Sequence, residues 1–204
     1  MSGFYPFNPN LGQVMQTGVE GVTVDRGFFA HFQVSATNAV ASSTAAVHAA
    51  IACSTEITTV STEFTNPGCP KNITATAGGT AGDIKAVQVT VTGTNYADEV
   101  ITEDLPAFSV DAAGTVTGNK AFKAVTAVSI PAMDGAGATV SIGFGEKLGL
   151  PFKLPHNTVL AAYVNNAKEG TTPTVAVSAT AVESNTIDLN TALDGHVVDA
   201  YLIV

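Results

Sequence analysis

VQVTVTGTNYADEVITEDL, at residues 87–105, contains the clearest alternation in this 204-residue chain. The valines at 87, 89 and 91 alternate with polar residues, and a period of two places all three on one face of a β-strand. Gly93, Thr94 and Asn95 are turn-forming residues. They predict a hairpin into a second strand at residues 99–105, which Pro106 limits because proline cannot donate to a strand ladder. The stretch therefore indicates antiparallel β-structure.

The same pattern of short strands separated by turns extends along the chain in both directions. Residues 120–130 alternate with one slip and end at Pro131, residues 139–142 form another strand, and the glycines of 143–151 predict a tight connection. About ten or eleven strands in total predict an all-β, antiparallel β-sandwich, jelly-roll-like, in a single domain. The remaining predicted strands are 28–34, 45–53 (with a helix as the alternative), 55–65, 72–76, 158–165, 174–182, 186–189 and 196–204.

The N-terminal residues differ from the rest of the chain. MSGFYPFNPN, at residues 1–10, holds two prolines and three aromatic residues. We therefore predict an extended N-terminal arm at residues 1–27, followed by the β-sandwich domain at residues 28–204. Aromatic side chains are unfavourable in water, so we expect Phe4, Tyr5 and Phe7 to anchor the arm on the body of the chain or on a neighbouring subunit.

The chain carries unusually little charge. Charged residues are 12% of the sequence, about half the usual share, and the net charge is −9. A surface covered by partners in an assembly explains the low charge, and so does a threonine-rich solvated surface. An acidic chain without a basic patch disfavours nucleic acid and anionic membranes as partners. We expect neither a secretory signal nor a transmembrane helix.

No pattern of metal-binding or catalytic residues is present. The two cysteines, Cys53 and Cys69, have no zinc-type spacing, and we expect free thiols, with a disulfide as the alternative. His31 lies opposite the apolar face of its strand, and we expect it to be structural. The acidic pairs at 98–99 and 103–104 point to opposite faces of a strand, so they cannot converge on one substrate. We predict no enzyme activity, no cofactor and no metal.

Several segments resemble structural proteins of tailed-bacteriophage virions. They are TGTN at 92–95, EVITE at 99–103, GNKAFK at 118–123 and GFGEKLGLP at 143–151, and the likeness reaches back to PKNIT at 70–74. It covers about half of the chain, residues 66–155. The resemblance is to the proteins that decorate and cement a phage head, and it carries no catalytic residues with it.

The resemblance implies a β-rich homo-oligomer, in particular a homotrimer, that binds the major capsid protein and stabilises the capsid by protein–protein contacts. The protein is then assembled into the virion in the host bacterial cytoplasm. Two alternatives remain open at this point. One is a phage tail or neck (connector) protein, and the other is a carbohydrate-binding adhesion module, which the absence of tryptophan disfavours.

Overall fold

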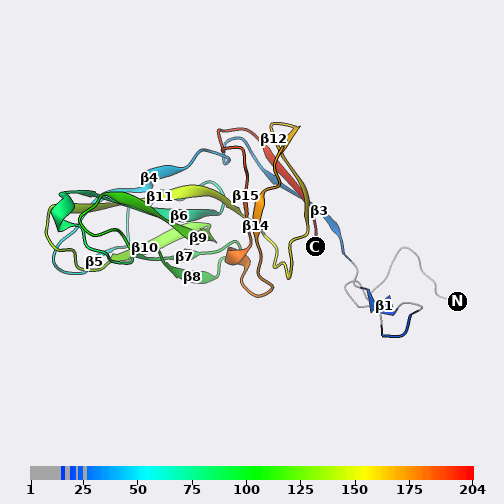
Figure 1. Ribbon diagram of the computed structural model, residues 1–204, viewed down its shortest axis with the longest axis horizontal. Helices are drawn as coiled ribbons and strands as arrows, with labels where there is room; N and C mark the ends of the chain where they lie inside the picture. Colours follow the sequence, from blue (N-terminus) through cyan, green and yellow to red (C-terminus); the bar gives the residue numbers. More distant parts are fainter. Residues whose placement is uncertain (1–14, 17–18, 22, 25–26) are drawn as a thin grey trace.

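The computed structural model describes residues 15–16, 19–21, 23–24 and 27–204 (Figure 1). Every strand pairing in this part is antiparallel, and the two helices are single 3-10 turns. In chain order the elements are β1 (Met15–Gln16), β2 (Thr23–Val24), β3 (Phe29–Val34), β4 (Ser43–Ala52), β5 (Thr58–Val60), β6 (Lys71–Gly79), η1 (Ala81–Asp83), β7 (Thr90–Thr94), β8 (Val100–Asp104), β9 (Gly114–Phe122), β10 (Ala124–Ile130), β11 (Ala138–Gly149), β12 (Val159–Val164), β13 (Ala167–Lys168), β14 (Thr174–Ala176), η2 (Val182–Ser184), β15 (Thr186–Asp188) and β16 (Val198–Ile203).

A β-sandwich forms the larger part of the molecule. One sheet has the order β5-β10-β7-β8, and the other has the order β14-β15-β11-β6-β9, with β4 also paired to β11. Between them lies a first hydrophobic core, which includes Ile73, Val91, Phe122 and Ile142. The prediction of an all-β antiparallel sandwich is therefore confirmed. The strand count exceeds the expected ten or eleven because β1, β2 and β13, of two residues each, were not predicted and because the strand expected at 120–130 is two strands.

A second hydrophobic core lies at the other end of the molecule. There the sheet β13-β12-β16-β3 packs its inner face against residues that follow β11 and β15. Strand β11 contributes to both cores, with Ile142 in the first and Leu148 in the second. In Figure 1 the sandwich lies on the left, β3 and β12 lie beyond it on the right, and β14 and β15 lie between the two. Residues 28–204 thus contain two cores joined by one long strand.

The hairpin predicted from the alternation is present. Val89 and Val91 are completely buried, and β7 pairs with β8 as expected. The predicted turn at residues 93–95 was too early, because β7 continues through Gly93 and the chain turns only after Asn95. Gly93 sits so close to the neighbouring strand that a Cβ would lie 2.0 Å from the carbonyl oxygen of Ala124. Here glycine marks a close approach of two strands rather than a turn.

Two further predictions on the central stretch were wrong. The single strand expected at 120–130 is two strands, β9 and β10, which belong to different sheets and are separated by Lys123. The connection expected at 143–151 is mostly the second half of β11. A Cβ on Gly143 would lie 1.8 Å from the carbonyl oxygen of Ser43, so β4 can cross there only because the side chain is absent.

The remaining strands vary in how closely they follow the predictions. The segment at 45–53 is a strand, β4, and the helix alternative is wrong. The closing strand at 196–204 is present as β16 and is paired on both sides, by β12 and β3. The strands expected at 55–65 and 174–182 are reduced to the three residues of β5 and of β14.

One lysine is buried in the fold. Lys71, at the start of β6, is fully buried, donates to the carbonyl oxygen of Val40 (2.5 Å) and lies 4.7 Å from the ring centroid of Phe144. Burial lowers the pKa of Lys71, an effect that Cys69 and Glu146 oppose. The Lys71 side chain thus joins the loop before β4 to the sheet β14-β15-β11-β6-β9, which we call the main sheet.

Candidate functional site

The predicted arm anchors, Phe4, Tyr5 and Phe7, lie outside the described residues, so the arm at residues 1–27 stays a prediction. Cys53 and Cys69 are free thiols, as expected; Cys53 is buried and Cys69 is partly buried. Burial raises the pKa of both thiols. Among the residues that the structure describes, no three acidic, histidine or cysteine side chains come together as metal ligands.

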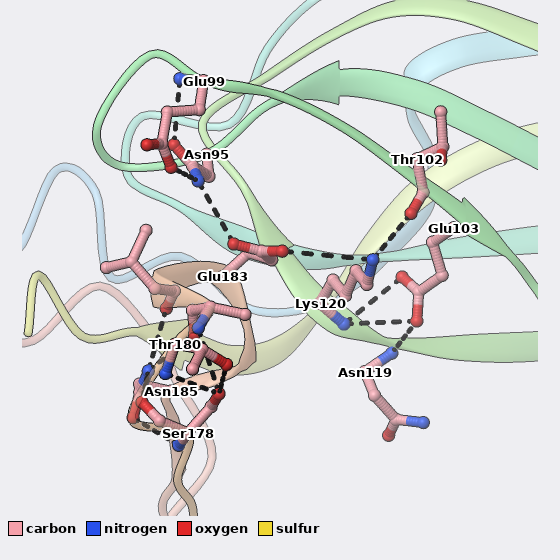
Figure 2. A network of polar contacts seen from close by, with 12 residues as sticks. Asn95, Glu99, Thr102, Glu103, Asn119, Lys120, Ser178, Thr180, Glu183 and Asn185 are labelled. Carbon is pink, nitrogen blue, oxygen red and sulfur yellow. Dashed lines mark hydrogen bonds and ion pairs between the residues drawn. The ribbon is translucent and has the colours of Figure 1, made fainter. Parts of the chain in front are cut away.

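The acidic pairs at 98–99 and 103–104 have separate structural partners. Asp98 forms an ion pair with Lys123 (2.7 Å), and Asp104 accepts a hydrogen bond from the hydroxyl of Thr90 (2.6 Å). Glu103 points the other way and accepts the backbone N–H groups of residues 119 and 120 on β9 (Figure 2). Glu103 and Asp104 therefore point to different faces of β8, as the strand period requires, whereas Asp98 and Glu99 lie before β8 and not in a strand as expected.

A polar network ties the turn after β7 to the second half of the chain (Figure 2). The buried amide of Asn95 donates to Glu99 (2.9 Å) and to Glu183 (3.1 Å) of η2. Glu183 also lies 4.0 Å from the ammonium of Lys120. Next to it, the fully buried Asn185 binds the backbone of residues 154, 178 and 181. The network holds loops in place and exposes no converging reactive groups.

The most distinctive surface is the outer face of the sheet β13-β12-β16-β3. The period of two places Phe32 and Val34 in the second core, and Phe29 and His31 on the opposite, solvent side. Tyr201 on β16 stacks between them, with ring centroids 5.6 Å from Phe29 and 4.8 Å from His31. Tyr163 on β12 meets Tyr201 edge to face at 5.8 Å. We call these four residues, Phe29, His31, Tyr163 and Tyr201, the aromatic face.

A carboxylate lies beneath the aromatic face. Asp199 is 9% exposed, and its Oδ1 atom is 2.6 Å from Nε2 of His31 and accepts a hydrogen bond from the amide of Gln33 at 2.8 Å. A cavity of about 340 Å³ opens above it, lined by Tyr163, Asn166, Asp199 and Tyr201. The pairing of Asp199 with His31 fixes the imidazole, which keeps the stacked rings in one arrangement.

The chemistry that this surface offers is binding. A nucleophilic mechanism would need a serine or cysteine beside the His31–Asp199 pair. In the described part of the chain, the side-chain contacts of His31 are to Asp199 and Tyr201. Phe29 is 63% exposed, and aromatic groups left in water at such a density are typical of surfaces that contact another molecule.

Sequence reasoning missed the aromatic face. It placed His31 on the solvent side correctly, but it did not combine that residue with Tyr163, Tyr201 and Asp199, which come from strands more than 120 residues away in the sequence. The available indication was the closing strand at 196–204. A strand of this kind must pair with other strands. Its outward side chains, which include Asp199 and Tyr201, therefore had to lie beside the outward side chains of a neighbouring strand.

Comparison with protein-family models, with curated proteins and with solved structures finds no match. In the described part of the chain, no helix has the length and apolar character of a membrane span. The function is therefore argued from the surface chemistry of the chain.

Proposed function

We propose that this chain is a non-catalytic structural protein of a bacteriophage virion that decorates and stabilises the capsid through protein–protein contacts. The observation that carries the proposal is the aromatic face. Its four rings hold one another by stacking and by the His31–Asp199 pair, so they are ordered before any partner arrives. A preformed surface loses little side-chain entropy on binding.

The edge of the same sheet supports the proposal. Strand β3 pairs with β16 on one side, and its other side has no strand partner among the described residues. Its sequence, FAHFQV, contains no lysine, proline or acidic residue of the kind that blocks pairing between edges. An unblocked edge next to an exposed aromatic surface is suited to contact with a second subunit or with a capsid protein.

The charge of the chain is consistent with this role. A protein with only 12% charged residues has few charges to desolvate when its surface is covered. We propose a homotrimer that binds the major capsid protein, with the arm residues Phe4, Tyr5 and Phe7 adding contacts to a neighbour. The tail or neck role is the alternative, and a larger ring would favour it.

The experiment measures the native mass of the purified chain and its binding to capsids that lack it. Phe29→Asp places a charge in the aromatic face, and Val100→Asp is the matched control. Val100 is 77% exposed and lies on β8 in the sheet β5-β10-β7-β8, which is not the sheet that carries the aromatic face. We expect a trimer that binds capsids, loss of assembly or capsid binding in Phe29→Asp, and no change in Val100→Asp.

Three results would contradict the proposal. The chain remains monomeric and does not bind capsids, the two variants behave alike, or Phe29→Asp assembles and binds as the unmodified chain does. Thermal unfolding of each variant separates a surface effect from a folding defect, because Phe29→Asp removes one ring contact worth about 1 kcal/mol. Deletion of residues 1–10 tests the arm independently.

A further inference from the structure

A second cavity lies on the outer face of the main sheet, away from the aromatic face. Its volume is about 300 Å³, at the lower end of the range for small-molecule sites. Thr74 on β6 and Thr117 on β9 lie directly opposite each other in it. Gly145 on β11 leaves room beside them, since a Cβ there would lie 2.6 Å from the side chain of Asn72.

Thr74 lines this cavity, and its hydroxyl has no hydrogen-bond partner. Thr74 is 6% exposed, and its Oγ1 atom is buried with no hydrogen bond, unlike every other buried side-chain oxygen or nitrogen in the described residues. A buried hydroxyl left unpaired costs stability. The neighbouring Asn72 cannot relieve it, because the Asn72 amide is bonded to the backbone of Gly118 and of Lys147.

A half-buried carboxylate in the same cavity also makes no hydrogen bond within the described residues. Asp188 on β15 lines the cavity, and its carboxylate accepts no hydrogen bond from the described part of the chain. Burial raises the pKa of Asp188, with Lys147 acting against the shift and Glu146 adding to it. Two polar groups in one cavity therefore lack a hydrogen-bond partner in the chain, and the buried one, the hydroxyl of Thr74, weakens the fold. Sites that sacrifice stability in this way are commonly binding sites.

The groups present select the kind of ligand. An anion is disfavoured, because Glu146 and Asp188 face the cavity with Lys147 as the one lysine in its lining. An apolar ligand would leave Thr74 and Asp188 unpaired. No set of three metal-ligating side chains occurs in the described residues. A neutral molecule with several hydroxyl groups can donate to the carboxylates and also pair with the threonine hydroxyls.

We propose that this cavity, built around Thr74, Thr117, Glu146 and Asp188, binds one unit of a neutral saccharide. Its hydroxyl groups would donate to Asp188 and Glu146, and would pair with the hydroxyl of Thr74 once that side chain rotates to turn its buried oxygen toward the cavity. The ring of Phe144, 7% exposed at the cavity wall, would give the ligand an apolar contact. This site is independent of the aromatic face and of the proposed structural role, because it is formed by other strands.

The test titrates the purified full chain with glucose, galactose, mannose and N-acetylglucosamine, and detects binding by saturation-transfer NMR and calorimetry. Thr74→Val removes the unpaired hydroxyl while keeping the branched shape. Thr90→Val is the control, since Thr90 lies on β7 in the other sheet and binds Asp104. Asp188→Asn tests the carboxylate.

We expect at least one of these sugars to bind with a Kd below about 10 mM. Thr74→Val and Asp188→Asn should each weaken binding about tenfold, while Thr90→Val leaves it unchanged. Thr74→Val should also unfold at the same or a higher temperature than the unmodified chain, which shows that lost binding is not lost folding. If no sugar binds, or if Thr74→Val binds as well as the unmodified chain, the proposal is wrong.

Discussion

Asn185 gives the sharpest prediction for stability, because one buried side chain makes four hydrogen bonds of 3.1 Å or shorter to backbone groups. Its Oδ1 atom accepts the N–H groups of Leu154 (3.1 Å) and Ser178 (2.8 Å), and its Nδ2 atom donates to the carbonyl oxygens of Ser178 (3.0 Å) and Ala181 (2.8 Å). Asn185→Ala leaves all four without this partner. An orphaned buried group costs about 1–3 kcal/mol, so even the lower value gives a loss of about 4 kcal/mol.

Equilibrium urea denaturation measures this loss, and hydrogen exchange locates it. Since a domain is stable by about 5–15 kcal/mol, the variant should unfold at a much lower urea concentration. The amides of Leu154 and Ser178 should lose protection first. Asn157→Ala is the matched control: Asn157 is exposed and accepts only the N–H group of Val159, so a change within about 1 kcal/mol is expected. A loss of similar size in both variants, or protected amides in Asn185→Ala, would refute the reasoning.

Three other predictions concern the buried charge, the strand glycines and the thiols. Because the pKa of Lys71 is lowered in the fold, the folded state holds fewer protons than the unfolded state between the lowered pKa and 10.5. Stability should therefore rise with pH in that window, and the pH profile of Lys71→Met, measured by urea denaturation, should lack this contribution. Gly143→Ala should destabilise the chain strongly in thermal unfolding, since its Cβ meets the Ser43 carbonyl oxygen, whereas Gly114→Ala, with open space around it, should not; equal effects would contradict the close packing of β4 on β11. Iodoacetamide should modify native Cys53 and Cys69 far more slowly than the unfolded chain, because the pKa of both thiols is raised; fast labelling of Cys53 would show that it is not buried.

The parts of the fold that follow from local alternation could be predicted. Val89 and Val91 fill the first core because the strand period is two, and the same rule placed Phe32 inside and His31 outside. The closing strand β16 was predicted because an apolar segment of that kind must be paired, and β12 and β3 pair it. These conclusions needed only neighbours in the sequence.

The parts that depend on distant contacts could not be predicted. Gly93 and Gly143 were interpreted as turn or connection residues, but each permits a neighbouring strand to approach, and nothing adjacent in the sequence shows that neighbour. The aromatic face joins residues of β3, β12 and β16. The unpaired state of Thr74 likewise depends on the positions of Asn72 and of three other strands.

The central claim is that the aromatic face is a contact surface, and the most direct measurement is the native mass of the unmodified chain and of Phe29→Asp by light scattering over a range of concentrations. The account predicts a stable trimer for the unmodified chain and a smaller mass for Phe29→Asp, with folding retained in both. A monomer at every concentration that also fails to bind capsids, or the same mass for both chains together with equal binding to capsids, would contradict it.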